Sequence, residues 1–144
     1  MVDVGAKTAT AREALARAQL CFPRGLLEAV MAGHGPKGPV TEVARVAGIL
    51  AAKRTSEWIP MCHVFPLDVV EITFTMLDTE RLEIRCRAAC TAKTGVEMEA
   101  LVGVSAAALA VYDMTKALDP AIVIERIELV EKRGGKSGVW RRES

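Results

Sequence analysis

The chain has 144 residues, a length typical of one domain that can bury a core, and we expect a single domain over residues 1–144. Its 19 Lys and Arg residues nearly balance 18 Asp and Glu residues, so no bulk positive charge attracts nucleic acid or an anionic membrane. Any anion site must be a local cluster. The first residues lack the apolar segment of a secretory signal, and the four cysteines form no C-x-x-C pair. Both features favour a cytoplasmic protein with free thiols.

The first half of the chain is predicted to hold one ambiguous segment and two helices. Residues 10–22 are rich in Ala, Arg, Glu and Leu, which favours a helix, but alternation from Ala14 to Phe22 also fits a strand. A short helix is expected over residues 24–32. After a glycine- and proline-rich loop, apolar residues at helical spacing predict a second helix from residue 40 to about 55.

The next segments predict a β-hairpin. Residues 59–66 are bracketed by prolines and are expected to be irregular. Apolar and polar residues then alternate over 70–76 and again over 82–90, which predicts two half-buried strands joined by a turn. Beyond the next helix, residues 122–131 are expected to form a last strand, followed by a glycine-rich tail loop.

The longest predicted element is a helix over residues 93–119. Its middle, residues 100–112, has no charged residue, so burial on nearly all sides is expected. Thr94 and Glu97 fit a capping box at its start, and Pro120 blocks its continuation. The uncharged stretch is shorter than the roughly 20 residues that a membrane span needs.

If residues 10–22 form a strand, the element order is β-α-β-β-α-β. This is the split βαβ pattern of an α+β fold, with the helices on one face of an antiparallel sheet. The other face would then carry charged residues: Glu71, Glu83, Arg85 and Arg87.

Basic residues recur beside glycines or at helix ends. Glycine allows close approach of the backbone to a phosphate, and lysine supplies the countercharge, so a polyphosphate or nucleotide site is one interpretation and solvated lysines are the other. Gly135-Lys136-Ser137 is not a P-loop, because Val130 stands where that motif needs glycine.

Two further groups could carry chemistry. Asp113 and Lys116 share a helix face, so they form either an acid/base pair or a surface ion pair at the helix end. Cys62-His63 could bind zinc with other thiols, but Cys86 and Cys90 fit the apolar face of a strand. A ligand-contacting or proton-transfer role for His63 is therefore favoured over metal binding, with a structural histidine as the alternative.

At these residues the sequence resembles the molybdenum cofactor biosynthesis protein C family, the cyclic pyranopterin monophosphate synthases. The matching segments are MVDVGAK at the start, AGILAAKRT (47–55), IPMCH (59–63), KTGVEMEAL (93–101), YDMTKA (112–117) and EKRGGKSG (131–138). They occur in family order over nearly the whole chain.

The resemblance implies a ferredoxin-like fold and a lyase that converts 3′,8-cyclo-7,8-dihydro-GTP to cyclic pyranopterin monophosphate with release of pyrophosphate. It implies a homohexamer, a trimer of dimers, and no metal or redox cofactor. Catalytic positions of the family fall on Asp113, Lys116 and Lys132. Substrate contacts fall on Lys37, Met61, Cys62, His63, Met98, Glu99 and Lys136. A nucleotide-binding module without turnover is the alternative, since the fold alone does not fix function.

The spacing of these positions predicts a shared site. Glu97 and Asp113 would lie about 24 Å apart along one helix, too far for one nucleotide-sized ligand to contact both. We therefore expect the start of the helix in one subunit to meet the end of the helix in another.

Overall fold

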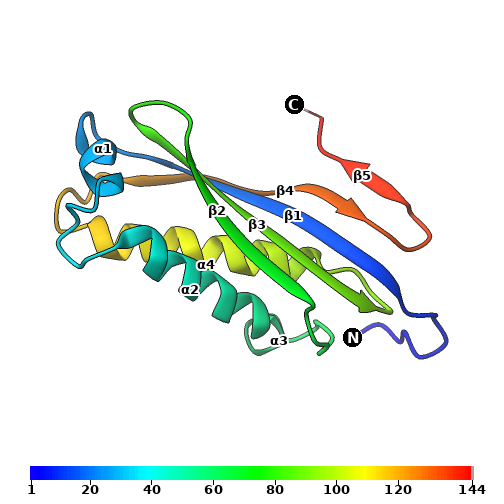
Figure 1. Ribbon diagram of the computed structural model, residues 1–144. Coiled ribbons are helices and arrows are strands. Elements are labelled where there is room, and N and C mark those ends of the chain that lie inside the picture. Colours follow the sequence, from blue (N-terminus) through cyan, green and yellow to red (C-terminus); the bar gives the residue numbers. More distant parts are fainter. Residues whose placement is uncertain (144) are drawn as a thin grey trace.

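The computed structural model describes residues 1–143. Its elements follow the predicted order, with two additions, α3 and β5 (Figure 1). They are β1 (Thr10–Cys21), α1 (Leu26–Met31), α2 (Val40–Lys53), α3 (Thr55–Trp58), β2 (Val69–Met76), β3 (Arg81–Ala92), α4 (Glu97–Thr115), β4 (Val123–Arg133) and β5 (Val139–Arg141).

The sheet confirms the predicted α+β class. Its strand order is β2-β3-β1-β4-β5, and every neighbouring pair is antiparallel. Without β5, this is the arrangement expected for a ferredoxin-like fold. The ambiguous segment is the central strand: Ala16, Ala18 and Leu20 are fully buried on one face, while Arg17 and Gln19 point to the other. Burial between two neighbouring strands therefore outweighs the helix propensity of these residues, and the segment forms a strand.

The helices cover one face of the sheet, as predicted (Figure 1). α4 lies along the middle strands, and α2 packs against α4 and β2. The two helices cross at glycines: a Cβ on Gly48 would lie 2.8 Å from the carbonyl oxygen of Gly103. This close crossing lets both helices reach the sheet.

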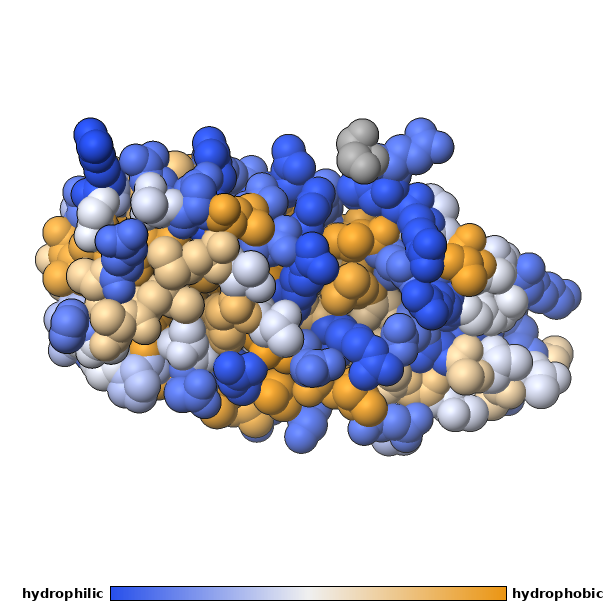
Figure 2. Space-filling model, turned by 45° about the horizontal axis from the view of Figure 1, so that its top comes forward, coloured by the Kyte–Doolittle hydropathy of each residue, from blue (hydrophilic) through white to orange (hydrophobic). Residues whose placement is uncertain are grey.

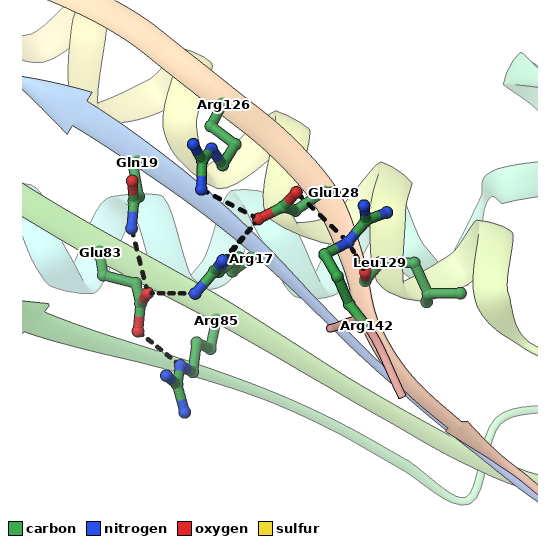
Figure 3. Close-up of polar contacts among 8 residues, drawn as sticks. All are labelled: Arg17, Gln19, Glu83, Arg85, Arg126, Glu128, Leu129 and Arg142. Carbon is green, nitrogen blue, oxygen red and sulfur yellow. Dashed lines mark hydrogen bonds and ion pairs between the residues drawn. The ribbon is translucent and has the colours of Figure 1, made fainter. Parts of the chain in front are cut away.

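The opposite face of the sheet carries charges that neutralise one another. Arg17 bridges Glu83 at 3.6 Å and Glu128 at 2.7 Å, and Arg85 contacts Glu83 at 2.5 Å (Figure 3). The Glu83 side chain is only 4% exposed, yet these partners satisfy it. Figure 2 shows hydrophilic side chains mixed with hydrophobic ones over the side of the molecule that faces the viewer.

Two expectations about the long helix were wrong. It begins at Glu97 and ends at Thr115, and no side chain caps it, because the Glu97 carboxylate bonds Lys132 instead of completing a capping box. The tail loop over residues 134–138 is as predicted, and residues 139–141 beyond it pair with β4 as β5. A short separate helix, α3, follows α2.

α4 is long and apolar enough to cross a membrane by length and composition, with a mean hydropathy of 1.3 in its 18-residue window. In the structure, 56% of that window is buried inside the fold. Its apolar character is therefore that of a core helix packed on the sheet.

Candidate active site

A cavity of about 800 Å³ lies between the start of α4 and the loop that joins β4 to β5. Six basic side chains line it against two acidic ones, Glu13 and Glu97. The basic residues are Lys7, Arg12, Lys93, Lys132, Arg133 and Lys136. This excess of positive charge suits a polyphosphate group, because ammonium and guanidinium groups are the usual partners of phosphate oxygens.

The glycine-rich loop is shaped to fit the side chain of Arg12. Gly134 and Gly135 have φ values of 99° and 69°, in the left-handed region that favours glycine. A Cβ on Gly135 would collide with the Arg12 guanidinium, and one on Gly134 with the carbonyl oxygen of Ala11. The two glycines therefore let the β4–β5 loop lie directly on Arg12.

Arg12 is the site residue that the sequence reasoning missed. Within residues 1–143, its Nε is buried without a hydrogen-bond partner. A buried donor left unpaired costs about 1–3 kcal/mol, which a ligand oxygen would recover. The signal was present in the sequence as a basic residue on an apolar-alternating strand, but only the fold brings it beside the glycine-rich loop.

Lys132 is held at the entrance of α4 by an ion pair. It lies on the helix-facing side of β4, in register with Ala14 of β1, and its Nζ donates to Glu97 Oε1 at 2.9 Å. Burial is the largest influence on Glu97 and raises its pKa, but the bond from Lys132 and the nearby positive charges outweigh burial and hold the pKa below its ordinary value. Glu97 therefore fixes the direction of the Lys132 ammonium.

A second cavity, of about 520 Å³, adjoins the first. The two share lining residues Lys7, Thr94, Gly95 and Glu97, so they form one continuous cleft. The second cavity brings together five of the expected substrate-contact residues, which lie far apart in sequence. They are Met61, Cys62, His63, Met98 and Glu99.

Glu99 is the unusual carboxyl group of this cleft. It is 5% exposed, and burial raises its pKa to about 7, helped by the charge of Glu97 and opposed by a hydrogen bond from its own backbone N–H. Burial and the charge of Glu99 also raise the pKa of the Cys62 thiol. A carboxyl group that titrates near neutral pH can both donate and accept a proton.

The N-terminal segment closes one side of the cleft. His63 Nε2 donates to the carbonyl oxygen of Val2 at 2.8 Å, and Lys93 Nζ donates to that of Gly5 at 2.7 Å. The MVDVGAK segment therefore packs against the residues of the cleft, although it lies far from them in sequence.

A second group of expected residues lies at the other end of α4. The Asp113 carboxylate accepts from Lys116 Nζ at 2.7 Å and from Lys37 Nζ at 2.8 Å. These bonds, Lys116 first, lower the pKa of Asp113 to about 2, and Asp113 in turn raises the pKa of Lys116. Asp113 is therefore a carboxylate and Lys116 an ammonium at neutral pH.

The structure thus places the expected residues in two groups within one chain. α4 is a continuous helix from Glu97 to Thr115, and at 1.5 Å per residue the separation of Glu97 and Asp113 is about 24 Å. Lys132, Lys136 and the residues of the second cavity belong to the first group. Lys37, Asp113 and Lys116 form the second.

Within the part of the chain that the structure describes, the thiols and carboxylates do not assemble into a metal site. Among residues 1–143, no group of three or more His, Cys, Asp or Glu side chains is arranged to hold a metal ion. Cys86 and Cys90 face the helices from β3, as predicted, and burial raises their pKa values to about 12 and about 11. They act as core side chains.

The sequence model of the MoaC family matches residues 1–135. A cyclic pyranopterin monophosphate synthase of Chloroflexus aggregans is 52% identical over 144 residues, covering 99% of this chain and 87% of the relative. The synthase of Novosphingobium aromaticivorans is 51% identical over 141 residues, covering 98% of this chain and 89% of the relative. The synthase of Thermomicrobium roseum is also 51% identical, with 99% and 87% covered.

Proposed function

This chain belongs to the MoaC family, and on that premise we propose that it is a lyase of molybdenum cofactor biosynthesis. Its substrate is 3′,8-cyclo-7,8-dihydro-GTP, and its products are cyclic pyranopterin monophosphate and pyrophosphate. The observation that carries a catalytic role, rather than binding alone, is the Asp113 carboxylate held between the ammonium groups of Lys37 and Lys116. Phosphate binding alone needs no carboxylate at that position.

The first cavity is the best place for the triphosphate. Six basic side chains surround it, and the unpaired Nε of Arg12 lies among them. Positive groups fixed in place would stabilise the charge that builds on pyrophosphate as it leaves. Lys132 and Lys136 contribute to this role from β4 and from the β4–β5 loop.

The second cavity suits the ring system of the substrate. Its walls include apolar side chains, Met61, Met98 and Phe65, together with His63 and the buried Glu99. An apolar cavity with a few polar groups is the usual form of a site that orients a heterocycle.

The Asp113 group supplies proton transfers. At neutral pH the Asp113 carboxylate can accept a proton and the Lys116 ammonium can donate one, so the pair can move protons as the purine-derived ring becomes a pterin. Formation of the cyclic phosphate requires a substrate oxygen to attack the α-phosphorus while the bond to the β-phosphate oxygen breaks. The attacking oxygen loses its proton to a base, and pyrophosphate carries away the bonding electrons.

The same proposal includes the assembly. The two groups of residues are about 24 Å apart on one helix, so a complete site needs the start of α4 from one subunit and the end of α4 from another. A hexamer built as a trimer of dimers would supply such pairs. The free cysteines agree with a cytoplasmic location, where thiols stay reduced.

The direct test supplies the cyclised dihydro-GTP to the purified chain and follows both pterin formation and pyrophosphate release. Stoichiometric formation of both products is expected. Tight substrate binding without either product would instead support the alternative of a binding module without turnover.

A further inference from the structure

The two cavities of the cleft meet at a junction that carries one positive side chain. The residues that line both cavities are Lys7, Thr94, Gly95 and Glu97. Among residues 1–143, Lys7 is the only basic residue that belongs to both linings. The other basic residues of the first cavity, and His63 of the second, each line one cavity alone. A ligand that extends from one cavity into the other therefore passes Lys7.

The Lys7 ammonium differs from its neighbours because the fold does not use it. Lys132 is paired with Glu97 at 2.9 Å, and Lys93 donates to the carbonyl oxygen of Gly5 at 2.7 Å. Within residues 1–143, Lys7 enters the hydrogen-bond pattern only through its backbone N–H, and its side chain is exposed. Its ammonium group is therefore available for an anionic group of a ligand.

A fixed turn holds Lys7 at the junction. The Asp3 carboxylate accepts from the Gly5 N–H at 2.7 Å. The Lys7 N–H donates to the carbonyl oxygen of Val4 at 3.0 Å, which closes the turn. Lys93 Nζ ties the same turn to the cleft through the carbonyl oxygen of Gly5. Because β1 begins three residues after Lys7, the backbone of Lys7 lies between an anchored turn and the central strand of the sheet.

The proposed function puts the reacting phosphorus at this junction. With the ring system in the second cavity and the β- and γ-phosphates in the first, the α-phosphate lies where the two cavities meet. A substrate hydroxyl oxygen forms a bond to its phosphorus while the bond to the bridging oxygen of pyrophosphate breaks. The hydroxyl proton passes to a base, and the bonding electrons leave with pyrophosphate. Negative charge therefore builds on the bridging oxygen, beside Lys7.

We propose that Lys7 is a further catalytic residue: its ammonium binds the α-phosphate and stabilises the charge that builds on the leaving oxygen. Lys93 is a positioning residue, because it acts on the α-phosphate through the turn that carries Lys7. Neither residue is among the site positions that the family resemblance implies. The catalytic role rests on the proposed function, whereas the contact with the α-phosphate of a bound nucleotide does not require turnover.

The first test compares the binding of GTP and of inorganic pyrophosphate by isothermal titration calorimetry. Pyrophosphate fills the first cavity alone, whereas GTP also places an α-phosphate at the junction. Lys7→Met removes the ammonium at nearly constant length, so GTP affinity should fall about 10-fold while pyrophosphate affinity stays within about three-fold of the wild type. Lys136→Met is the matched contrast, because Lys136 lines the first cavity alone and its loss should weaken both probes equally.

The second test measures turnover of the cyclised dihydro-GTP. In Lys7→Met, kcat should fall at least ~100-fold, the usual cost of removing one group that stabilises charge in a transition state. Lys7→Arg restores a positive charge and should recover much of this loss. Arg24→Met, at an exposed basic residue in the turn before α1, is the control and should keep the wild-type kcat. Circular dichroism checks that each variant is folded.

A double variant tests the positioning role. Since Lys93 acts through Lys7, Lys93→Met should lower kcat in the wild-type chain but should not lower it further in Lys7→Met. Losses in kcat that multiply in the double variant would reject the role of Lys93.

The binding and turnover measurements separate two kinds of failure. If Lys7→Met keeps the wild-type kcat, or weakens GTP and pyrophosphate equally, the role of Lys7 is overturned even if the chain is an active lyase. If the wild-type chain shows no turnover, but Lys7→Met weakens GTP and not pyrophosphate, the proposed function is rejected and the contact between Lys7 and the α-phosphate stands.

Discussion

Asp113 shows how two neighbours set the state of one side chain. Its carboxylate is exposed, yet hydrogen bonds from Lys116 and Lys37 lower its pKa to about 2. Lys37 lies in the loop before α2, and its Nζ reaches the Asp113 carboxylate at 2.8 Å. The charge arrangement needed for proton transfer is therefore present in this chain.

Replacement of this carboxylate should remove turnover without unfolding the chain. Asp113→Asn keeps the shape of the side chain but cannot accept a proton, so we expect kcat to fall at least ~100-fold, the usual loss for an acid/base group. The measurement is the rate of pterin formation at saturating substrate. Asp68→Asn, at another exposed aspartate, is the control and should keep the wild-type rate.

Glu99 makes stability depend on pH in the opposite sense to a salt-bridged carboxylate. Burial raises its pKa from an ordinary value of 4.5 to about 7, so the folded chain binds this proton more tightly than the unfolded chain does. The cost of ionising Glu99 is absent below pH 4.5, grows between the two pKa values and is complete above about pH 7.

From pH 5 to pH 8, the free energy of unfolding should therefore fall less in Glu99→Gln than in the wild-type chain. At 1.36 kcal/mol per pKa unit, we expect the two changes in the free energy of unfolding to differ by about 1–3 kcal/mol over this range. Urea unfolding at the two pH values measures it, with Glu57→Gln, at an exposed glutamate, as the control. Parallel pH dependence in Glu99→Gln and the wild type would contradict this assignment.

At the scale of elements, the β4–β5 loop combines backbone conformation with a close contact. Gly135 and Gly138 both have positive φ values, 69° and 63°, but only at Gly135 would a Cβ meet the Arg12 guanidinium. At Gly138 the same atom would enter open space. A comparison of alanine substitutions at Gly135 and Gly138 therefore separates the cost of backbone strain from the cost of displacing Arg12.

Gly135→Ala should weaken binding of inorganic pyrophosphate at least ~10-fold, because the loop must move off Arg12 and the cluster of basic groups opens. Gly138→Ala carries a similar backbone cost, on the order of 1 kcal/mol, and should bind pyrophosphate nearly as well as the wild type. Isothermal titration calorimetry measures both. Equal weakening in the two variants would show that Arg12 has no part in the effect.

The sequence predicted those elements whose local pattern and tertiary surroundings agree. The hairpin of β2 and β3 and the packing of Cys86 and Cys90 followed from period-two alternation. β1 was ambiguous because its alanines favour a helix, and only pairing on both edges decides its state. The capping box was wrong because Lys132, far away in sequence, takes the Glu97 carboxylate.

The candidate site residues, too, could be predicted only where a local motif carries them. Motif resemblance identified ten residues, and the structure gathers Met61, Cys62, His63, Met98 and Glu99 in one cavity. Arg12 was missed because its role depends on a loop more than 120 positions later, whose shape no local pattern relates to β1. Long-range contacts of this kind are fixed by the fold alone.

For the whole molecule, the separation of the two groups of residues is the deciding fact. A rigid helix holds Met98 and Asp113 apart, so no movement of the chain short of unfolding α4 brings them together. In the shared site that we propose, two copies meet and each subunit contributes one half to each of two sites, so that catalysis depends on assembly.

Mixing two inactive variants tests that coupling most directly. Asp113→Asn destroys one half of the site and Met98→Arg the other, so a dimer with one subunit of each kind keeps one intact site out of two. After subunit exchange, half of the dimers are mixed, and we predict about a quarter of the wild-type rate of pterin formation. Activity that stays at the level of the separate variants, although exchange is confirmed by mass spectrometry, would contradict a site shared between subunits.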